Sequence, residues 1–254
     1  MPKSPTDKRH FILAAALVAI STVLMDILLK SVIPLPVQAS IEALTIDALI
    51  GWHFTMIAFL FSLVVVFMLY TIVVFRRREG DTEEGMHFEG HTTLEIVWTV
   101  VPLITVLVFS FYGLNALAKV TRSEPNELVV KITGFQWAWT FEYPEGFVSP
   151  ELVLPVNQRA HMEMNSRDVI HSFWIPEMRV KQDVVPGMTT NIRITPILEG
   201  EYKLRCAELC GLSHWSMLAP VRVVSQAEYD QWVKDQTAAL DPALAQAEET
   251  QTTD

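Results

Sequence analysis

Three long apolar runs lie within the first 118 residues, and they constrain the fold more than any other feature. The run from Trp52 to Phe75 has 24 residues and the run from Ile96 to Ala118 has 23; neither contains Asp, Glu, Lys or Arg. About 20 apolar residues cross the hydrocarbon core of a bilayer as a helix. Both runs are therefore predicted to be transmembrane helices, joined as a hairpin.

The first apolar run, Phe11 to Met25, is shorter and is preceded by Lys3, Lys8 and Arg9. This order is typical of a secretory signal, and Val37-Gln38-Ala39 is a weak cleavage site. The alternative is an uncleaved first helix that reaches to about Ile33. Retention is favoured, but the sequence leaves both readings open.

Basic residues beside the spans predict the orientation, because cytoplasmic loops carry an excess of Lys and Arg. Arg76, Arg77 and Arg78 directly follow the second run. The loop 76–94 is therefore predicted to be cytoplasmic, as is the basic N-terminal end. Residues 34–50 and everything after residue 118 then lie on the outer face of the membrane, whether or not the first segment is removed.

From Glu127 onward, short apolar stretches are broken by Pro, Gly and Asn. Predicted strands, rich in Val, Ile, Thr and aromatic residues, are 128–143, 152–157, 161–166, 189–196, 202–206 and 219–224. Many short strands at this spacing predict an antiparallel sandwich or barrel. Gln226 to Gln236 is predicted to be a helix, and the rest a disordered acidic tail.

These boundaries predict a membrane-anchored all-β protein in four parts. The parts are 1–39, a signal or first transmembrane segment; 40–118, the hairpin with helices at about 52–75 and 96–118; 119–224, the extracytoplasmic β domain; and 225–254, the short helix and tail. Residues 119–254 hold 19 acidic and 12 basic residues. This excess of acid excludes a nucleic-acid partner and suits a cationic protein.

The stretch 206–217, CAELCGLSHWSM, contains the only two cysteines of the chain. A disulfide is the simplest reading for an exported domain, but it explains none of the neighbouring residues. Zinc would be satisfied by both cysteines with His171 and His214, but the spacing differs from that of the usual fingers. A zinc site would also leave Met217 unused, although a thioether favours copper.

A copper site uses all of these side chains. Electron-transfer copper sites on β domains take one distant His, then Cys, His and a weak Met from one loop. This chain supplies His171 upstream, then His214 and Met217 after the cysteines, and it adds a second thiolate. Two thiolates can bridge two copper ions, which spreads the charge so that the geometry changes little on reduction. The backbone carbonyl of Glu208 can complete the shell of one copper.

The motif C-x-E-x-C-x-x-x-H-x-x-M after D-V-x-H-S-F at 168–173 resembles subunit II of haem–copper cytochrome c oxidases, with its binuclear CuA centre. The resemblance covers roughly residues 50–233 and includes GFQWAW at 134–139 and KQDVVPG at 181–187. It implies a cupredoxin-like Greek-key β-barrel, held on the outer side of a bacterial plasma membrane.

The resemblance also implies a role for each matching position. The implied CuA ligands are His171, Cys206, the Glu208 carbonyl, Cys210, His214 and Met217. The Glu208 side chain would bind magnesium shared with subunit I, and Trp137 would receive electrons from the donor. Trp139 lies two residues further on, which predicts the same strand face, and it is read as structural.

Three further carboxylates match positions with roles in the family. Glu142 and Asp168 would help to dock a cationic cytochrome c, although a surface carboxylate is usually only solvated. Glu95 would mark the mouth of a proton-uptake path in subunit I. A simpler reading is that Thr92-Thr93-Leu94-Glu95 is a capping box at a helix start.

The implied function is a redox relay: the chain accepts electrons at CuA and passes them to haem in subunit I, where oxygen is reduced and protons are pumped. Its partners would be subunit I, subunit III, membrane lipid and a donor, either cytochrome c or a small blue copper protein. No C-x-x-C-H motif occurs, so the sequence predicts a separate donor. The alternatives are a quinol oxidase subunit II without copper, the copper domain of nitrous oxide reductase, and a membrane-anchored copper carrier or insertion protein.

Overall fold

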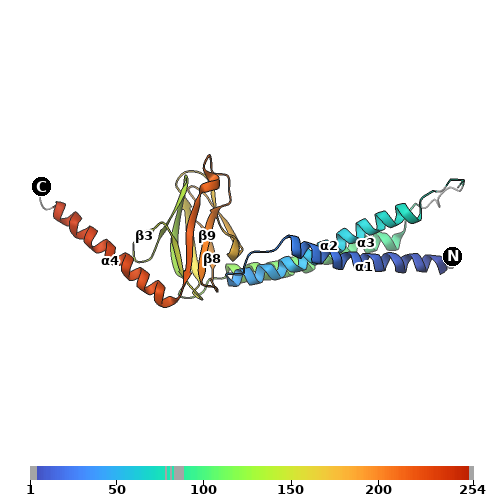
Figure 1. The fold of residues 1–254 in the computed structure, drawn as a ribbon, viewed down its shortest axis with the longest axis horizontal. Coiled ribbons are helices and arrows are strands. Elements are labelled where there is room, and N and C mark those ends of the chain that lie inside the picture. The colour runs from blue at the N-terminus through green and yellow to red at the C-terminus, as the bar shows by residue number, and fades with distance from the viewer. Residues whose placement is uncertain (1–4, 78, 81, 83–88, 252–254) are drawn as a thin grey trace. The chain divides into compact units, whose positions relative to one another are not determined.

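Three long helices precede the β domain. The computed structural model describes residues 5–77, 79–80, 82 and 89–251, so Arg78 of the basic cluster lies outside the described residues. The helices are α1 (Pro5–Val32), α2 (Ile41–Val74) and α3 (Thr92–Thr121), and each is long and apolar enough to cross a membrane. Figure 1 shows them in blue to green along the chain. The two predicted spans are confirmed as helices, and α1 adds a third.

Helix α2 begins eleven residues before the predicted Trp52. The hydroxyl of Ser40 accepts a hydrogen bond from Ala43 N–H at 3.0 Å, which caps the first turn. Glu42 lies in that turn, where the partial positive charge of the helix N-terminus stabilises its carboxylate. The prediction counted only uninterrupted apolar residues and therefore missed this polar start.

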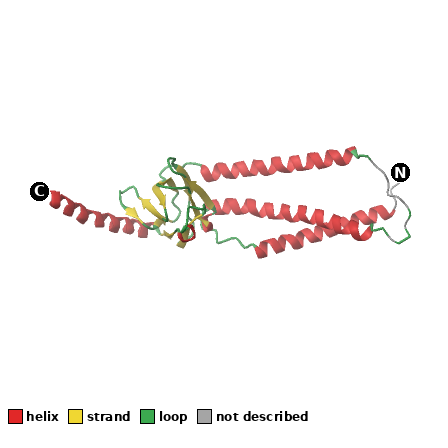
Figure 2. Cartoon of the chain, turned by 90° about the horizontal axis from the view of Figure 1, so that it is seen from above, coloured by secondary structure: helices red, strands yellow, loops and turns green. Residues whose placement is uncertain are grey.

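In the described part of the chain, ten strands form two five-stranded sheets; strands are drawn in yellow in Figure 2. In spatial order the first sheet is β3 (Val148–Ser149), β2 (Ala138–Glu142), β1 (Leu128–Phe135), β5 (Ala160–Ser166) and β8 (Thr190–Ile194). The second is β4 (Leu152–Pro155), β10 (Leu218–Val224), β9 (Gly200–Cys206), β6 (His171–Ile175) and β7 (Val180–Val184). Three long helices followed by a β-sandwich confirm the predicted fold class.

The sheets are mixed rather than purely antiparallel. Strands β1 and β5 pair in parallel, as do β4 and β10, while the other pairs are antiparallel. The predicted strand 128–143 is in fact two strands, because the chain turns at Gln136 and Trp137. The two indoles consequently do not share a face: Trp139 is 3% exposed and Trp137 is 37% exposed. The same-face prediction was wrong because it assumed an unbroken strand.

The core lies between the two sheets and is filled by inward-facing alternate residues. Strand β5 shows this pattern: Met162 and Met164 are fully buried, while His161 and Glu163 between them are only half-buried. Phe141 and Phe173 come from opposite sheets and are also fully buried. This packed core holds the ends of β6 and β9 rigidly, and those ends carry the residues considered next.

Helix α4 (Gln226–Gln251) is longer than the predicted 226–236 and replaces most of the predicted disordered tail; residues 252–254 lie outside the described part. The residues after Gln236 are rich in Ala, Glu and Gln, which are good helix formers, so the correction follows from propensity. Its first turns are anchored by Trp232, whose ring centroid lies 4.9 Å from that of Tyr143 and 5.2 Å from that of Phe147.

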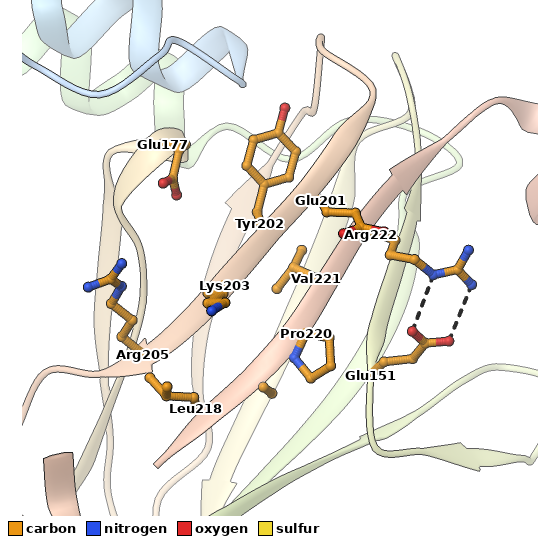
Figure 3. A pocket seen from close by; sticks show the side chains of 11 residues that line it. Glu151, Glu177, Glu201, Tyr202, Lys203, Arg205, Leu218, Pro220, Val221 and Arg222 are labelled. Atoms are coloured by element: carbon orange, nitrogen blue, oxygen red, sulfur yellow. Dashed lines mark hydrogen bonds and ion pairs between the residues drawn. The ribbon is translucent and has the colours of Figure 1, made fainter. Parts of the chain in front are cut away.

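A groove crosses the outer face of the second sheet along β9 and β10 (Figure 3). Its wall carries charges of both signs, including Lys203 and Glu201, and Arg222 forms a two-point ion pair with Glu151 at 3.2 Å. None of the residues with metal-binding side chains in 206–217 lines this groove. The groove is therefore separate from the stretch 206–217, which is called the cysteine loop below.

Candidate metal centre

The two cysteines lie at the end of β9 and in the loop that follows it. Their sulfurs are 3.8 Å apart, well beyond the roughly 2 Å of a disulfide, and both thiols are free. Two sulfurs that each lie about 2.3 Å from one tetrahedral metal ion are about 3.8 Å apart. The thiols thus have the separation of a pair that shares a metal rather than a covalent bond.

His171 reaches this pair from β6 in the same sheet. It is fully buried, and its Nδ1 lies 3.9 Å from the Cys206 sulfur. His171 and the two cysteines form the group of possible metal ligands found among the described residues. Strand β6 was not predicted from the sequence, but His171 was predicted as a metal ligand.

The other nitrogen of His171 is held by Asp168. Nε2 lies 2.8 Å from the Asp168 carboxylate, so the proton sits on Nε2 and the lone pair of Nδ1 faces the thiols. Removal from water would raise the pKa of Asp168, but hydrogen bonds from Gln136 N–H, His171 and Val169 N–H lower it to about 2. Asp168 is thus a stable carboxylate that orients the imidazole.

Three more donor atoms surround the thiols. Nδ1 of His214 lies 3.5 Å from the Cys210 sulfur, and the buried Met217 sulfur lies 3.7 Å from it. The carbonyl oxygen of Glu208 lies 3.3 Å from the Cys206 sulfur. A short 3₁₀ turn, His214–Ser216, brings the histidine and the methionine back to the cysteines.

The surroundings of the Cys210 thiol favour its protonated form. Burial, together with the neighbouring Cys206 sulfur, raises the pKa of the Cys210 thiol to about 12. A metal ion that accepts both sulfurs would release their protons. Two thiols, two imidazoles, a thioether and a carbonyl form a soft donor set that fits copper better than a hard cation.

The comparisons with known proteins agree with this geometry. Two sequence models match the chain: "Cytochrome C oxidase subunit II, periplasmic domain" over residues 147–225, and "Cytochrome C oxidase subunit II, transmembrane domain" over residues 28–116. Cytochrome c oxidase subunit 2 of Synechocystis sp. is 30% identical, and the match covers 83% of this chain and 78% of that protein. The chain belongs to the cytochrome c oxidase subunit II family.

Other relatives are similar to a comparable extent. Cytochrome c oxidase subunit 2 of Thermostichus vulcanus is 31% identical, with 83% of this chain and 81% of that protein covered. Among solved structures, the periplasmic domain of subunit II from Bradyrhizobium japonicum is 30% identical, with a TM-score of 0.43 over 47% of this chain and 98% of that one. The matched families and the Synechocystis relative show that the chain is a membrane-bound subunit of cytochrome c oxidase with a periplasmic C-terminal domain, which confirms the predicted placement of that domain on the outer side of the membrane.

Trp137, the expected electron acceptor of this subunit II, lies against the cysteine loop. A Cβ on Gly211 would lie 3.4 Å from the indole and 2.8 Å from Gln136 Nε2. The same Gln136 amide donates a 2.7 Å hydrogen bond to the Cys210 carbonyl. Gly211 also has φ +121°, so glycine is required here for both conformation and space.

Two residues that support the centre carried no clear signal in the sequence. The ring of Trp139 packs edge-on against His171, with 5.9 Å between the centroids. Gly134 makes room for both rings: a Cβ there would lie 3.0 Å from the Trp139 ring and 3.2 Å from His171 Cδ2. Only the pairing of β1 with β2, which sets Gly134 opposite Trp139, reveals this role.

None of the other predicted functional carboxylates belongs to the group of possible metal ligands among the described residues. Glu208 is exposed, and Glu142 forms an exposed cross-strand ion pair with Lys131 at 2.9 Å. Glu95 accepts a 3.1 Å hydrogen bond from His91 N–H, and the His91 ring accepts one from Leu94 N–H at 3.3 Å. The cap of α3 is therefore His91 rather than the predicted Thr92, because the helix begins at Thr92 itself, one residue earlier than a Thr92 cap requires.

Proposed function

We propose that this subunit holds a binuclear CuA centre that receives electrons from an external donor and passes them to haem in subunit I. One observation carries the proposal. The donor atoms of His171, Cys206, Glu208, Cys210, His214 and Met217 gather around two unbonded sulfurs 3.8 Å apart. Each sulfur has its own imidazole within 4 Å, as two ions bridged by both thiolates require.

A bound pair of copper ions sharing one unpaired electron would supply one-electron transfer at low reorganisation cost. The protein's part is to hold the ligands still. His171 is fixed by the Asp168 hydrogen bond and the Trp139 ring, and Met217 is fully buried. Ligands locked by packing and outer hydrogen bonds change position little when the charge changes.

Electrons arrive, in this proposal, through Trp137. Its indole is partly exposed, and its other side lies beside Gly211, the residue after Cys210. The Gln136 hydrogen bond to the Cys210 carbonyl ties the same turn to the cysteine loop. An aromatic ring that bridges solvent and the ligand loop suits contact with a soluble or membrane-bound cytochrome c, or with a blue copper protein.

The cysteine loop exposes apolar side chains. Leu209, Leu212 and Trp215 are 78%, 89% and 81% exposed in this single chain. Exposed apolar clusters of this kind mark contact sites for other proteins. We assign this surface to partners of the oxidase, including subunit I; subunit III and membrane lipid complete the proposed assembly.

Three site assignments rest on the family resemblance. Glu208 presents an exposed carboxylate for magnesium shared with subunit I, and Glu95 lies at the start of α3, where proton uptake is proposed. Glu142 and Asp168 are proposed to help dock a cationic donor. The two carboxylates differ, because Asp168 is already committed to His171 whereas Glu142 faces solvent.

Metal analysis and electron paramagnetic resonance of the purified subunit test the central proposal. Two copper ions per chain are expected, with the hyperfine pattern of one electron shared equally by two copper nuclei. Cys206→Ser and Cys210→Ser should each abolish that pattern. Met217→Leu should alter it, while the matched control Met188→Leu, an exposed methionine, should not.

The alternatives predict different results. A copper carrier or insertion protein would hold one loosely bound, spectroscopically silent Cu(I), and a copper-free quinol oxidase subunit would hold none. Either result would overturn the proposed relay. Zinc at full occupancy, with no copper signal after reconstitution, would contradict it as well.

A further inference from the structure

The segment that joins α1 to α2 is built into the β-sandwich. Ala39 is fully buried; its N–H donates to the Glu177 carbonyl at 2.9 Å, and its own carbonyl accepts from Ile197 N–H at 2.9 Å. The Arg179 guanidinium reaches back to the carbonyl oxygens of Pro36 and Val37. The segment is thus an integral piece of the domain rather than a free linker.

The next residue, Ser40, is also fully buried. Its hydroxyl donates to the Met178 carbonyl at 3.0 Å and accepts from Ala43 N–H at 3.0 Å. Ile41 N–H adds a 3.0 Å hydrogen bond to the Thr195 carbonyl. Ser40 therefore caps α2 and fastens its start to the sandwich at the same time.

These contacts conflict with cleavage after Ala39, the signal-peptidase site that the sequence suggests. A cut there would place a charged ammonium group on the buried Ser40, which is costly without a partner anion. It would also remove Ala39 and leave the Glu177 carbonyl and the Ile197 N–H without their partners. Buried backbone groups without hydrogen bonds are strongly disfavoured.

Helix α1 is fitted to α2 by contacts that a discarded signal does not need. Asp26 accepts a 2.9 Å hydrogen bond from the Thr55 hydroxyl, and the His10 ring lies 2.7 Å from the Tyr70 hydroxyl. These two bonds set one antiparallel register, and Val18 and Ser62, which that register brings opposite each other, are both buried. Polar groups in membrane helices are stable when they are paired in this way.

We propose that the mature subunit keeps residues 5–39 and that α1 remains as a third transmembrane helix. The matched family transmembrane domain begins at residue 28, inside the end of α1, so most of this helix lies outside that match. The proposal concerns the anchor and is independent of copper binding. It also makes the segment 36–40 a structural element of the periplasmic domain.

Intact-mass spectrometry of the full-length subunit, purified from its own membranes with a C-terminal tag, gives the first test. The expected mass includes α1 and the Ala39–Ser40 bond. The variant Val37→Asp, at a half-exposed side chain, blocks signal-peptidase recognition and should change the mass only by the substitution itself. A mature N-terminus at Ser40, or a gain of the leader's mass in Val37→Asp, would overturn the proposal.

A second test separates the segment from the helix. Two chains are made with a foreign cleavable signal, one starting at Ser31 and the other at Ser40, and thermal unfolding of the β domain is followed by near-UV circular dichroism. The chain starting at Ser31 keeps the segment and should unfold at the full-length temperature. The chain starting at Ser40 should unfold at least about 5 °C lower. Equal melting of the two chains would show that the segment is dispensable and would contradict the structural role argued here.

Discussion

Asp168 could position the His171 imidazole or help to dock a cationic donor, and its hydrogen bond to His171 favours the positioning role. If Asp168 positions the imidazole, Asp168→Asn should weaken copper retention about 10- to 100-fold and change the electron paramagnetic resonance spectrum. His171 and Val169 N–H donate to one oxygen of the Asp168 carboxylate, and Gln136 N–H donates to the other. An asparagine amide has only one oxygen that can accept, so it cannot keep all three hydrogen bonds. Copper content after dialysis against a chelator measures the loss.

The matched control is Glu142→Gln, because Glu142 is an exposed carboxylate paired only with Lys131 among the described residues. It should leave the spectrum unchanged and affect only the salt-dependent rate of electron transfer from a cationic donor. If Asp168→Asn behaved in the same way, docking would be its sole role and the positioning role would be wrong.

Gly134 gives a second test at the residue scale. Gly134→Ala places a Cβ 3.0 Å from Trp139 and 3.2 Å from His171, so one ring must move. The variant should lose about 1–3 kcal/mol of unfolding free energy and show a perturbed copper spectrum. Gly113→Ala, whose Cβ would meet nothing within 4 Å, should change neither. Normal stability and an unaltered spectrum in Gly134→Ala would disprove the packing argument.

The metal ligands could be predicted from the sequence because all of them except His171 lie within the twelve residues 206–217. Their supports could not be predicted. Gln136, Trp139 and Gly134 act through contacts that exist only after β1 and β2 pair and the cysteine loop folds over the turn between them. The periodicity of a sequence indicates a strand, but it does not indicate that the Trp139 ring packs against the His171 ring.

At the scale of elements, a buried ion-pair network joins the start of α2 and the end of α3 to the sandwich. Arg159 is 8% exposed; it pairs with Glu42 at 2.9 Å and Glu127 at 3.3 Å, and it donates to the Val120 carbonyl at 2.8 Å. Arg159→Met should destabilise the domain by about 3–5 kcal/mol, because the buried Glu42 carboxylate loses the guanidinium that pairs with it. Glu127 loses one of two partners and keeps Arg193 at 3.0 Å. Denaturant unfolding monitored by tryptophan fluorescence measures the change.

The control is Arg122→Met, which removes a cation from an exposed pair with Glu124 and should cost about 0–1 kcal/mol. A loss below about 1 kcal/mol in Arg159→Met would mean that the buried network contributes no more than a surface pair.

The helices were easier to predict than the strands. An apolar run long enough to cross the bilayer core is expected to form a membrane-spanning helix, so α2 and α3 were predicted. The polar start of α2 was not predicted, because it depends on the Ser40 cap. Strand β6 was missed because four of its five residues are buried and it shows no alternation. The parallel pairs β1–β5 and β4–β10 join strands distant in sequence, which local patterns do not encode.

At the scale of the whole molecule, acid should loosen the periplasmic domain. Burial would raise the pKa of Glu127, but hydrogen bonds from Glu124 N–H and Arg193 and the nearby charges lower it below its usual 4.5. The unfolded carboxylate therefore binds its proton first, so the stabilisation is complete above about pH 4.5 and is lost as the pH falls through the lower, folded value. Unfolding free energy should decline over that range, and Glu127→Gln should show a shallower decline. Identical pH profiles would exclude this contribution.

The subunit combines three apolar helices with a β-sandwich that has a ligand cluster at one end of its second sheet. We propose that electrons reach haem only through this chain. The most direct test is flash reduction of the purified oxidase with its donor, in which the near-infrared copper band and the haem band are followed together. We expect the copper band to bleach first and to recover as haem is reduced, and we expect both steps to vanish in Cys206→Ser. Haem reduction at an unchanged rate in Cys206→Ser would contradict it.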